Sequence, residues 1–411
     1  MKPEVFFAPL VRGMFIEKTG GPWTVAYESG ALAGTGAPAG ADATAGAGGA
    51  TDFTAGIDTS NEKIAAGQLS SAFAASGFAG ENKIPLRVKI TSGGNGYVYL
   101  TAPDYAGIDC IRKGRQKTAW DIPEKSPGTA DFGASRAAVV KNRAALITGG
   151  AQGFGEEIVR GLAAAGALVF IADLNKTGAE KLAAALNREY GRTLAFPVEV
   201  NVADETSVQN MAETIALTTG GLDLCVSNAG VLRAASILEQ DIGSFRFVTD
   251  INYTAFAIVT KHCGLLMKAQ HAAAPSWAAD IIQINSKSGL DGSNKNGSYA
   301  GSKFGSIGLV QSFAKELVEY SIKVNAVCPG NFFDGPLWSD PEKGLFVQYL
   351  NAGKVPGAKT IADVKAFYES KVPMGRGCTG PDVIRAVLYL VEQLYETGQA
   401  LPVTGGQVML S

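Results

Sequence analysis

The spacing of hydrophobic and polar positions changes near residue 144. From there to the C-terminus, short apolar runs alternate with longer stretches in which apolar residues recur every three to four positions. The runs predict buried strands and the stretches predict amphipathic helices. Such alternation is typical of a doubly wound (Rossmann) α/β fold, a parallel sheet with helices on both faces. We expect seven strands, at 144–148, 168–172, 194–198, 222–227, 281–284, 323–327 and 401–403. Helices are expected at 153–165, 178–190, 205–217, 242–268, 298–320 and 381–395.

The first 135 residues lack this alternation. Residues 30–56 are almost wholly Gly, Ala, Thr, Asp and Pro and cannot bury a core, so we expect a loosely ordered loop. Residues 126–135, rich in Pro and Gly, read as a linker. The sequence thus predicts a small β-rich accessory domain, residues 1–135, that folds apart from residues 136–411. Its short strands are expected at 4–15, 23–27, 86–90, 96–100 and 108–111, with a hairpin turn at 93–96 and a helix at 62–78.

Length, charge and composition narrow the class of protein. A chain of 411 residues favours two domains, and a formal net charge of -2 argues against a nucleic-acid-binding protein, which carries a basic surface. The five cysteines are scattered and the two histidines lack metal-ligand spacing, so we expect free thiols and no metal site. Charged and proline residues interrupt residues 1–16, and no apolar run reaches about eighteen residues. We therefore expect no signal peptide, no membrane span and a cytoplasmic location.

A glycine-rich loop directly follows the first strand of the second part, with the sequence Thr148-Gly149-Gly150-Ala151-Gln152-Gly153-Phe154-Gly155. Its glycines permit a tight turn and a close approach of the backbone to a pyrophosphate, whose charge the N-terminus of the next helix favours. Asp173 ends the second strand, where a carboxylate binds ribose hydroxyls and repels a 2′-phosphate. This arrangement favours NAD over NADP, although Lys176, a cation that would attract a 2′-phosphate, stands nearby.

Candidate proton-transfer chemistry lies between residues 281 and 305. Ser286 ends an apolar strand, and thirteen residues later Tyr299 begins a helix that also carries Lys303. Positions i and i+4 share one helix face, so the phenol and the ammonium are expected side by side, with the cation lowering the pKa of the phenol. Two hydroxyls and an ammonium suit proton transfer to or from an alcohol or carbonyl oxygen.

These motifs resemble those of the short-chain dehydrogenase/reductase family over residues 144–411, as do Asn228-Ala229-Gly230, Asn252 and Pro329-Gly330. The resemblance implies that Tyr299 is the general acid/base, that Ser286 hydrogen-bonds the reacting oxygen and that Lys303 holds the nicotinamide ribose. It also implies that Asn252 keeps a water in a proton relay and that the protein forms a homodimer or homotetramer through its long helices. The implied cofactor site comprises Thr148, Gly149, Gln152, Gly153, Phe154, Gly155, Asp173, Leu174, Asn201, Val202, Asn228, Ala229, Gly230, Tyr299, Lys303, Pro329 and Gly330.

Residues 282–289, 371–378 and 403–410 further resemble a subgroup of this family that acts on sugar-alcohol phosphates. That resemblance implies NAD-dependent oxidation of sorbitol 6-phosphate to fructose 6-phosphate, with Lys287, Arg233 and Arg376 as candidates to bind the phosphate. Two alternatives remain open: a dehydrogenase of an unphosphorylated polyol or other secondary alcohol, and an NAD-binding regulator without turnover. The intact Ser-Tyr-Lys set argues against the regulator.

The sequence departs from the family pattern at three places. Asn201 stands where an Asp often faces the adenine, and Asp334-Gly335-Pro336 stands where Ser or Thr often meets the nicotinamide amide. The first 135 residues have no counterpart in the usual family member. Residues 331–373 are expected to form a lid over the substrate.

Overall fold

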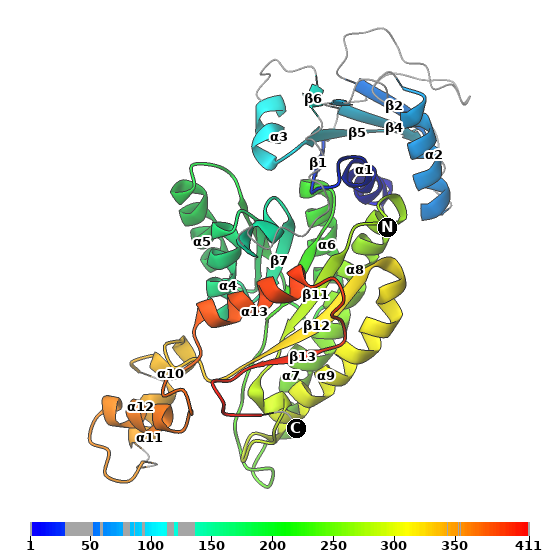
Figure 1. Ribbon diagram of the computed structural model, residues 1–411. Coiled ribbons are helices and arrows are strands. Elements are labelled where there is room, and N and C mark those ends of the chain that lie inside the picture. Colours follow the sequence, from blue (N-terminus) through cyan, green and yellow to red (C-terminus); the bar gives the residue numbers. More distant parts are fainter. Residues whose placement is uncertain are drawn as a thin grey trace.

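The computed structural model describes residues 2–28, 52–57, 61–76, 83–85, 87–92, 95–112, 119–121, 136–342, 344–351, 353 and 355–409. At its centre is a seven-stranded sheet in the order β13-β12-β11-β10-β7-β8-β9, in which all neighbouring strands are parallel (Figure 1). The predicted doubly wound fold and its seven strands are confirmed. The strands are β7 Ala144–Thr148, β8 Leu168–Asp173, β9 Ala195–Glu199, β10 Leu224–Ser227, β11 Ala279–Ile284, β12 Ile322–Pro329 and β13 Ala400–Val403.

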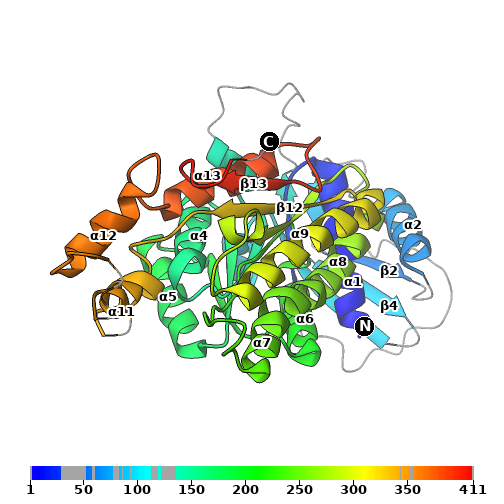
Figure 2. The same cartoon turned by 90° about the horizontal axis from the view of Figure 1, so that it is seen from below.

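Helices cover both faces of this sheet (Figure 2). One buried cluster joins the sheet to α4 (Gly153–Ala164), α5 (Lys176–Glu189) and α13 (Gly380–Glu392). A second cluster joins the other face to α6 (Glu205–Thr219), α8 (Ala255–Ala273) and α9 (Gly297–Leu317). The chain runs from β7 outward through β8 and β9 and then returns to β10 on the other side of β7. The crevice between β7 and β10 is therefore the switch point at which open α/β sheets bind ligands.

The long helix predicted at 242–268 is interrupted. It consists of α7 (Ile242–Thr249), one π-helical turn (Asp250–Thr254) and α8. A π-helical turn inserts one extra residue into an α-helix and re-aims its side chains, and such turns recur at functional sites. The turn carries Asn252, which is buried.

In the N-terminal part, two of the predicted strands are helices. Residues 4–15 belong to helix α1 (Pro3–Thr19), and residues 108–111 belong to helix α3 (Tyr105–Arg112). α1 begins with Pro at its first position and ends at Gly20 in the left-handed conformation, both ordinary helix-end signals. Because α1 is buried almost all round, its apolar residues show no helical period, and an apolar run alone does not distinguish a buried helix from a strand.

Four N-terminal strands form a small mixed sheet in the order β1-β5-β4-β2, and β3 pairs with β6 in a separate sheet. The predicted hairpin is confirmed, because β4 and β5 are antiparallel with Ser92 opposite Asn95. Residues 52–56, predicted within the loop at 30–56, form a strand that pairs with β4; residues 30–50 and the linker at 126–135 lie outside the described residues. The elements are β1 Thr24–Tyr27, β2 Asp52–Gly56, α2 Glu62–Ala74, β3 Lys83–Pro85, β4 Arg87–Ser92, β5 Asn95–Ala102 and β6 Ala119–Asp121.

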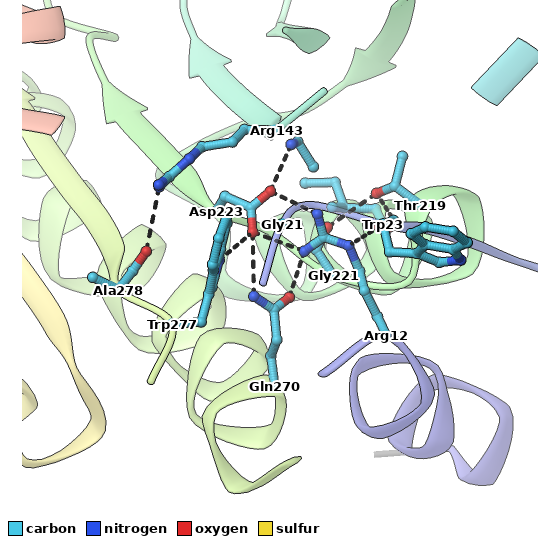
Figure 3. Close-up of polar contacts among 12 residues, drawn as sticks. Arg12, Gly21, Trp23, Arg143, Thr219, Gly221, Asp223, Gln270, Trp277 and Ala278 are labelled. Carbon is cyan, nitrogen blue, oxygen red and sulfur yellow. Dashed lines mark hydrogen bonds and ion pairs between the residues drawn. The ribbon is translucent and has the colours of Figure 1, made fainter. Parts of the chain in front are cut away.

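A buried contact joins α1 to the large sheet (Figure 3). The guanidinium of Arg12 donates to both carboxylate oxygens of Asp223, which precedes β10, at 2.8 and 2.6 Å. Gln270 on α8 accepts from Arg12 at 2.6 Å, and the indole of Trp277 donates to Asp223 at 2.9 Å. Arg12 and Asp223 are 1% and 0% exposed, so the N-terminal helix shares a desolvated polar network with the core of the second part.

Cysteines and possible metal ligands can be located in the part of the chain that is described. Four cysteines are free and buried, at positions 225, 263, 328 and 378. In the described ranges no group of three or more His, Cys, Asp or Glu is placed to hold a metal ion. No helix within those ranges has both the length and the hydropathy needed to cross a bilayer.

Candidate active site

Ser286, Tyr299 and Lys303 meet where β11 ends and α9 begins. Ser286 follows β11, and its hydroxyl accepts the Ser288 N–H at 3.1 Å. Ser286 and Tyr299 line the same cavity, and the Ser286 hydroxyl acts to lower the pKa of Tyr299. Lys303 lies one turn along α9, with its ammonium 5.7 Å from the centre of the Tyr299 ring. That ammonium donates to the Ile284 carbonyl at 2.9 Å. The structure therefore brings the three residues predicted for proton transfer to one place.

The electrostatics of this set differ from the sequence-based expectation. Burial raises the pKa of Tyr299, and the hydrogen bond from Ser286 opposes this only in part. Burial likewise lowers the pKa of Lys303 to about 8. The expected lowering of the Tyr299 pKa is thus not found, because the cost of burying a phenolate outweighs the lowering by the Ser286 hydroxyl.

Asn252 connects two segments beside this set. Its carboxamide oxygen accepts the Val231 N–H at 2.8 Å. Its amide nitrogen donates to the Val231 carbonyl at 2.9 Å and to the Ser302 hydroxyl at 3.2 Å. Asn252 therefore ties the segment after β10 to α9, and its role in holding a water stays a prediction.

The glycine loop fits the phosphates of a dinucleotide. Gly149 and Gly153 have positive φ, and a Cβ at Gly155 would lie 1.9 Å from the Gly149 carbonyl oxygen, so that position excludes any side chain. A Cβ at Gly153 would meet nothing within 4 Å, which leaves the backbone at the N-terminus of α4 open to a ligand. The Asn228 side chain donates to the carbonyls of Thr148 and Gly149 at 3.0 and 3.1 Å and thereby holds the loop. Free N–H groups and the helix dipole at this end favour an anion.

Asp173 lies beside the same loop. Its carboxylate accepts the Ala151 N–H at 3.0 Å and the Asn175 N–H at 2.8 Å. Each oxygen of a carboxylate accepts more than one hydrogen bond, so these contacts leave capacity for ribose hydroxyls. Asn201 uses its side-chain oxygen to accept the Ala203 N–H at 3.1 Å.

A cavity of about 510 Å³ connects the glycine loop to Tyr299. Nine of the residues predicted for the cofactor site line it, namely Gly149, Gln152, Gly153, Phe154, Asn228, Ala229, Gly230, Tyr299 and Gly330, as does Ser286. The other predicted positions do not line the cavity: Thr148, Gly155, Asp173, Leu174, Asn201, Val202, Lys303 and Pro329, together with Asn252. Of these, Leu174 is exposed, whereas Lys303 is buried with its ammonium on the Ile284 carbonyl.

The three cations predicted for a substrate phosphate are in different places. Lys287 lines the cavity. Arg233 instead lies over the Phe247 ring at 4.4 Å and donates to Ser244. Arg376 forms a bidentate pair with Asp382, at 2.6 and 3.0 Å, and lines a separate cavity. Of the three predicted cations, Lys287 is therefore the one that lies at this cavity.

Residues 331–373, the predicted lid, include three short helices (orange in Figure 1), and residues of this segment line the cavity. They are α10 (Pro336–Ser339), α11 (Leu345–Asn351) and α12 (Ile361–Ser370). Lys365 on α12 pairs with Asp334 at 2.7 Å, so Asp334 is engaged within this segment. Sequence reasoning missed the aromatic side chains that this segment turns toward the cavity; its density of Trp, Tyr and Phe was the available signal. The aromatic residues of this segment that line the cavity are Phe332, Trp338, Tyr349 and Tyr368.

Phe332 also reaches the glycine loop. Its ring stacks on Phe154, with the ring centres 4.3 Å apart and the planes 13° from parallel. Phe154 opens α4 and Phe332 follows β12, so the stack connects the two elements on either side of the cavity.

Known proteins resemble this chain in sequence and in fold. Residues 143–338 match the model of the short chain dehydrogenase family. Sorbitol-6-phosphate 2-dehydrogenase of Escherichia coli (strain K12) is 35% identical over 270 residues, which are 65% of this chain and 99% of that protein. Trans-4-hydroxycyclohexanecarboxylate dehydrogenase of Sinomonas cyclohexanicum is 30% identical over 65% of this chain and 93% of its own length. The crystal structure of sorbitol-6-phosphate 2-dehydrogenase from Erwinia amylovora is 36% identical, with a TM-score of 0.60 over 65% of this chain and 100% of that chain.

Proposed function

The chain belongs to the short-chain dehydrogenase family, and on this premise we propose that it is an NAD-dependent oxidoreductase that interconverts a sugar-alcohol phosphate and a ketose phosphate. The proposed pair is sorbitol 6-phosphate and fructose 6-phosphate. The observation that carries the proposal is the position of Tyr299 and Ser286 on the wall of a cavity that continues to the glycine loop.

In the proposed mechanism, Tyr299 exchanges a proton with the reacting oxygen. In alcohol oxidation the phenolate of Tyr299 takes the hydroxyl proton, and in reduction the phenol returns it. Ser286, on the same cavity wall as Tyr299, orients the same oxygen. A bound nicotinamide would supply the hydride acceptor for the carbon that bears this oxygen. Lys303, held by the Ile284 carbonyl, supplies a positive charge behind the phenol.

NAD is proposed over NADP because of Asp173. Its carboxylate lies at the glycine loop, where it contacts the Ala151 N–H. A carboxylate at that position accepts ribose hydroxyls and repels a 2′-phosphate. Lys176 pairs with Glu199 at 3.5 Å, so a second carboxylate offsets its charge.

Two observations support a phosphorylated substrate. Lys287 lines the cavity directly after Ser286, where it is placed to contact an anion bound beside Tyr299. Two similar proteins are sorbitol-6-phosphate 2-dehydrogenases by name.

A second candidate is a dehydrogenase of an unphosphorylated polyol or another secondary alcohol. It is favoured by the engagement of Arg233 and Arg376 away from the cavity, which leaves Lys287 as the single charged residue among the described lining residues.

An assay of NADH formation separates the two candidates. Sorbitol 6-phosphate, free sorbitol and other polyols are compared at equal concentrations with NAD and with NADP. The proposal predicts a higher kcat/KM for sorbitol 6-phosphate with NAD. If free sorbitol were used with an equal kcat/KM, the second candidate would replace the proposed function.

The domain boundary, the oligomeric state and the location of the protein stay proposals. We propose residues 136–411 as the dehydrogenase domain and residues 1–135 as an added part without an assigned activity. We further propose that the protein assembles as a homodimer or homotetramer and lies in the cytoplasm. Its proposed partner is a small-molecule substrate, with no nucleic-acid or membrane partner. The Arg12–Asp223 pair is a physical reason to expect that the two parts fold together.

A further inference from the structure

We propose that Asn285 is a positioning residue for proton transfer, because its carboxamide fixes the strand end that carries Ser286 against the helix that carries Tyr299 and Lys303. This inference rests on the proposed function of the same site. Asn285 lies between β11 and Ser286, is 4% exposed, and is absent from the residues that line the cavity. It therefore acts through its neighbours and does not touch the substrate.

Three hydrogen bonds hold this carboxamide. Its nitrogen donates to the Gln283 side-chain oxygen at 2.9 Å and to the Lys303 carbonyl at 3.0 Å. Its oxygen accepts the N–H of Ser286 at 2.8 Å. Because one end meets two acceptors and the other meets a donor, only one orientation of the amide satisfies the site. A buried amide satisfied in this way keeps its neighbours in a single arrangement.

Two of the hydrogen bonds between the strand end and α9 run in opposite directions. Lys303 donates from its ammonium to the Ile284 carbonyl at 2.9 Å, and Asn285 donates from its amide to the Lys303 carbonyl. Together they fix residues 284–286 relative to Lys303. Since Tyr299 lies one turn before Lys303 on α9, this pair of bonds also sets the distance between the hydroxyls of Ser286 and Tyr299.

Gly289 provides the space that the carboxamide needs. A Cβ at this position would lie 2.1 Å from the Asn285 side-chain oxygen and 3.1 Å from the Lys303 carbonyl oxygen. A methyl group there would therefore displace the amide without changing its chemistry.

The test is the isosteric substitution Asn285→Asp in the full chain. It replaces the amide nitrogen by an oxygen that faces two acceptors and places a negative charge beside the proton-transfer set. A nearby negative charge disfavours the phenolate of Tyr299. The matched control is Asn325→Asp on β12, a buried asparagine that likewise donates to one backbone carbonyl, of Glu396, and accepts one backbone N–H, of Gln399.

The main readout is the ionisation of Tyr299, followed by the near-ultraviolet absorbance of tyrosinate. Subtracting the titration of the same protein with Tyr299→Phe isolates the signal of that one residue. We expect Asn285→Asp to move the midpoint for Tyr299 upward by about one pH unit or more. The pH profile of kcat for NADH formation from sorbitol 6-phosphate and NAD should move in the same direction. Asn325→Asp should lower the melting temperature but leave both pH profiles unchanged.

An unchanged midpoint in Asn285→Asp, or an equal shift in Asn325→Asp, would overturn the inference. If Asn285→Asp fails to fold, Gly289→Ala takes its place, and an unchanged kcat and midpoint in that variant would have the same consequence. Failure of the unaltered protein to oxidise sorbitol 6-phosphate would remove the proposed substrate, while the Tyr299 titration would still decide the role of Asn285.

Discussion

Arg12 and Asp223, separated by 211 positions in the sequence, form a bidentate ion pair in the interior of the protein. The first residue belongs to α1 and the second precedes β10 in the large sheet. Asp223 also accepts the N–H of Ala144 at 2.8 Å, at the start of β7. Figure 3 shows how Gln270 and Trp277 complete the shell around this carboxylate. The N-terminal helix thereby neutralises a charge at the base of the two strands that flank the proposed cofactor site.

Arg12→Met should destabilise the folded protein strongly. Loss of the guanidinium leaves Asp223 buried without a counter-charge, a change that costs about 3–5 kcal/mol when one partner of a buried pair is removed. Urea unfolding measures the effect. Arg160→Met, which breaks the exposed pair with Glu156, is the control and should cost no more than about 0.5 kcal/mol. Equal effects of the two substitutions would show that the buried pair contributes no more to the free energy of unfolding than the exposed pair.

The same pair predicts a pH dependence. Burial disfavours the charged form of Asp223, but the charge and hydrogen bonds of Arg12 prevail and lower its pKa from 3.8 to about 2. Because the folded pKa lies below the unfolded one, the stabilisation of about 2 kcal/mol is present above about pH 4 and is lost as the pH falls toward about 2.

In Arg12→Met the sign should reverse. Burial, the largest influence on Asp223, then acts without the charge and hydrogen bonds of Arg12 and against Arg143 alone among the cations. It should raise the pKa of Asp223 above the unfolded value, so stability should fall as the pH rises above about 4. Urea midpoints of both proteins from about pH 4 to about pH 7 test this. Parallel curves would contradict the assignment.

Much of the second part was predictable from sequence because local signals there agree with the tertiary structure. Strands β7 and β8 are short apolar runs buried on both faces, and the glycines at 149–155 are needed by the backbone itself. The proximity of Ser286 to Tyr299 also followed, because a strand end and the next helix in a parallel sheet meet at one edge.

The N-terminal part and the cavity wall were less predictable for physical reasons. α1 is buried almost all round, so its burial hides the helical period. The partnership of Arg12 with Asp223 depends on tertiary contacts between distant segments, which a local pattern does not encode. The direction of the Tyr299 pKa depends on burial, which spacing alone does not reveal. The bonds of Asn285 likewise require the register of β11 against α9.

Asp173→Ala should relax the choice of cofactor. The variant loses both the acceptor for ribose hydroxyls and the repulsion of a 2′-phosphate, so the ratio of kcat/KM for NAD over that for NADP should fall. Asp241→Ala is the control, since Asp241 accepts the Ser244 N–H in a similar way at the start of α7. An unaltered ratio in Asp173→Ala would mean that this carboxylate does not meet the ribose.

Lys287→Ala should raise the KM for sorbitol 6-phosphate on the order of tenfold and leave the KM for NAD unchanged. The loss of one charge-assisted hydrogen bond to a phosphate accounts for a change of this size, and kcat should change little because ground state and transition state lose it equally. Lys295→Ala is the control, an exposed lysine on the same loop that does not line the cavity. If both substitutions changed this KM equally, Lys287 would contribute only as a general surface charge and not by contacting the phosphate.

The central claim is that Tyr299 exchanges the proton with the reacting oxygen, and Tyr299→Phe tests it most directly. The substitution removes one oxygen from the cavity wall, and the loss of a general base is expected to lower kcat by about 10²–10⁴-fold. The measurement is kcat for NADH formation from sorbitol 6-phosphate, together with the dissociation constant for NADH from fluorescence titration. Tyr395→Phe, at a fully exposed tyrosine, is the control and should leave both values unchanged. The account predicts a loss of kcat of this size in Tyr299→Phe with NADH binding intact, whereas near-normal turnover of that variant would contradict it.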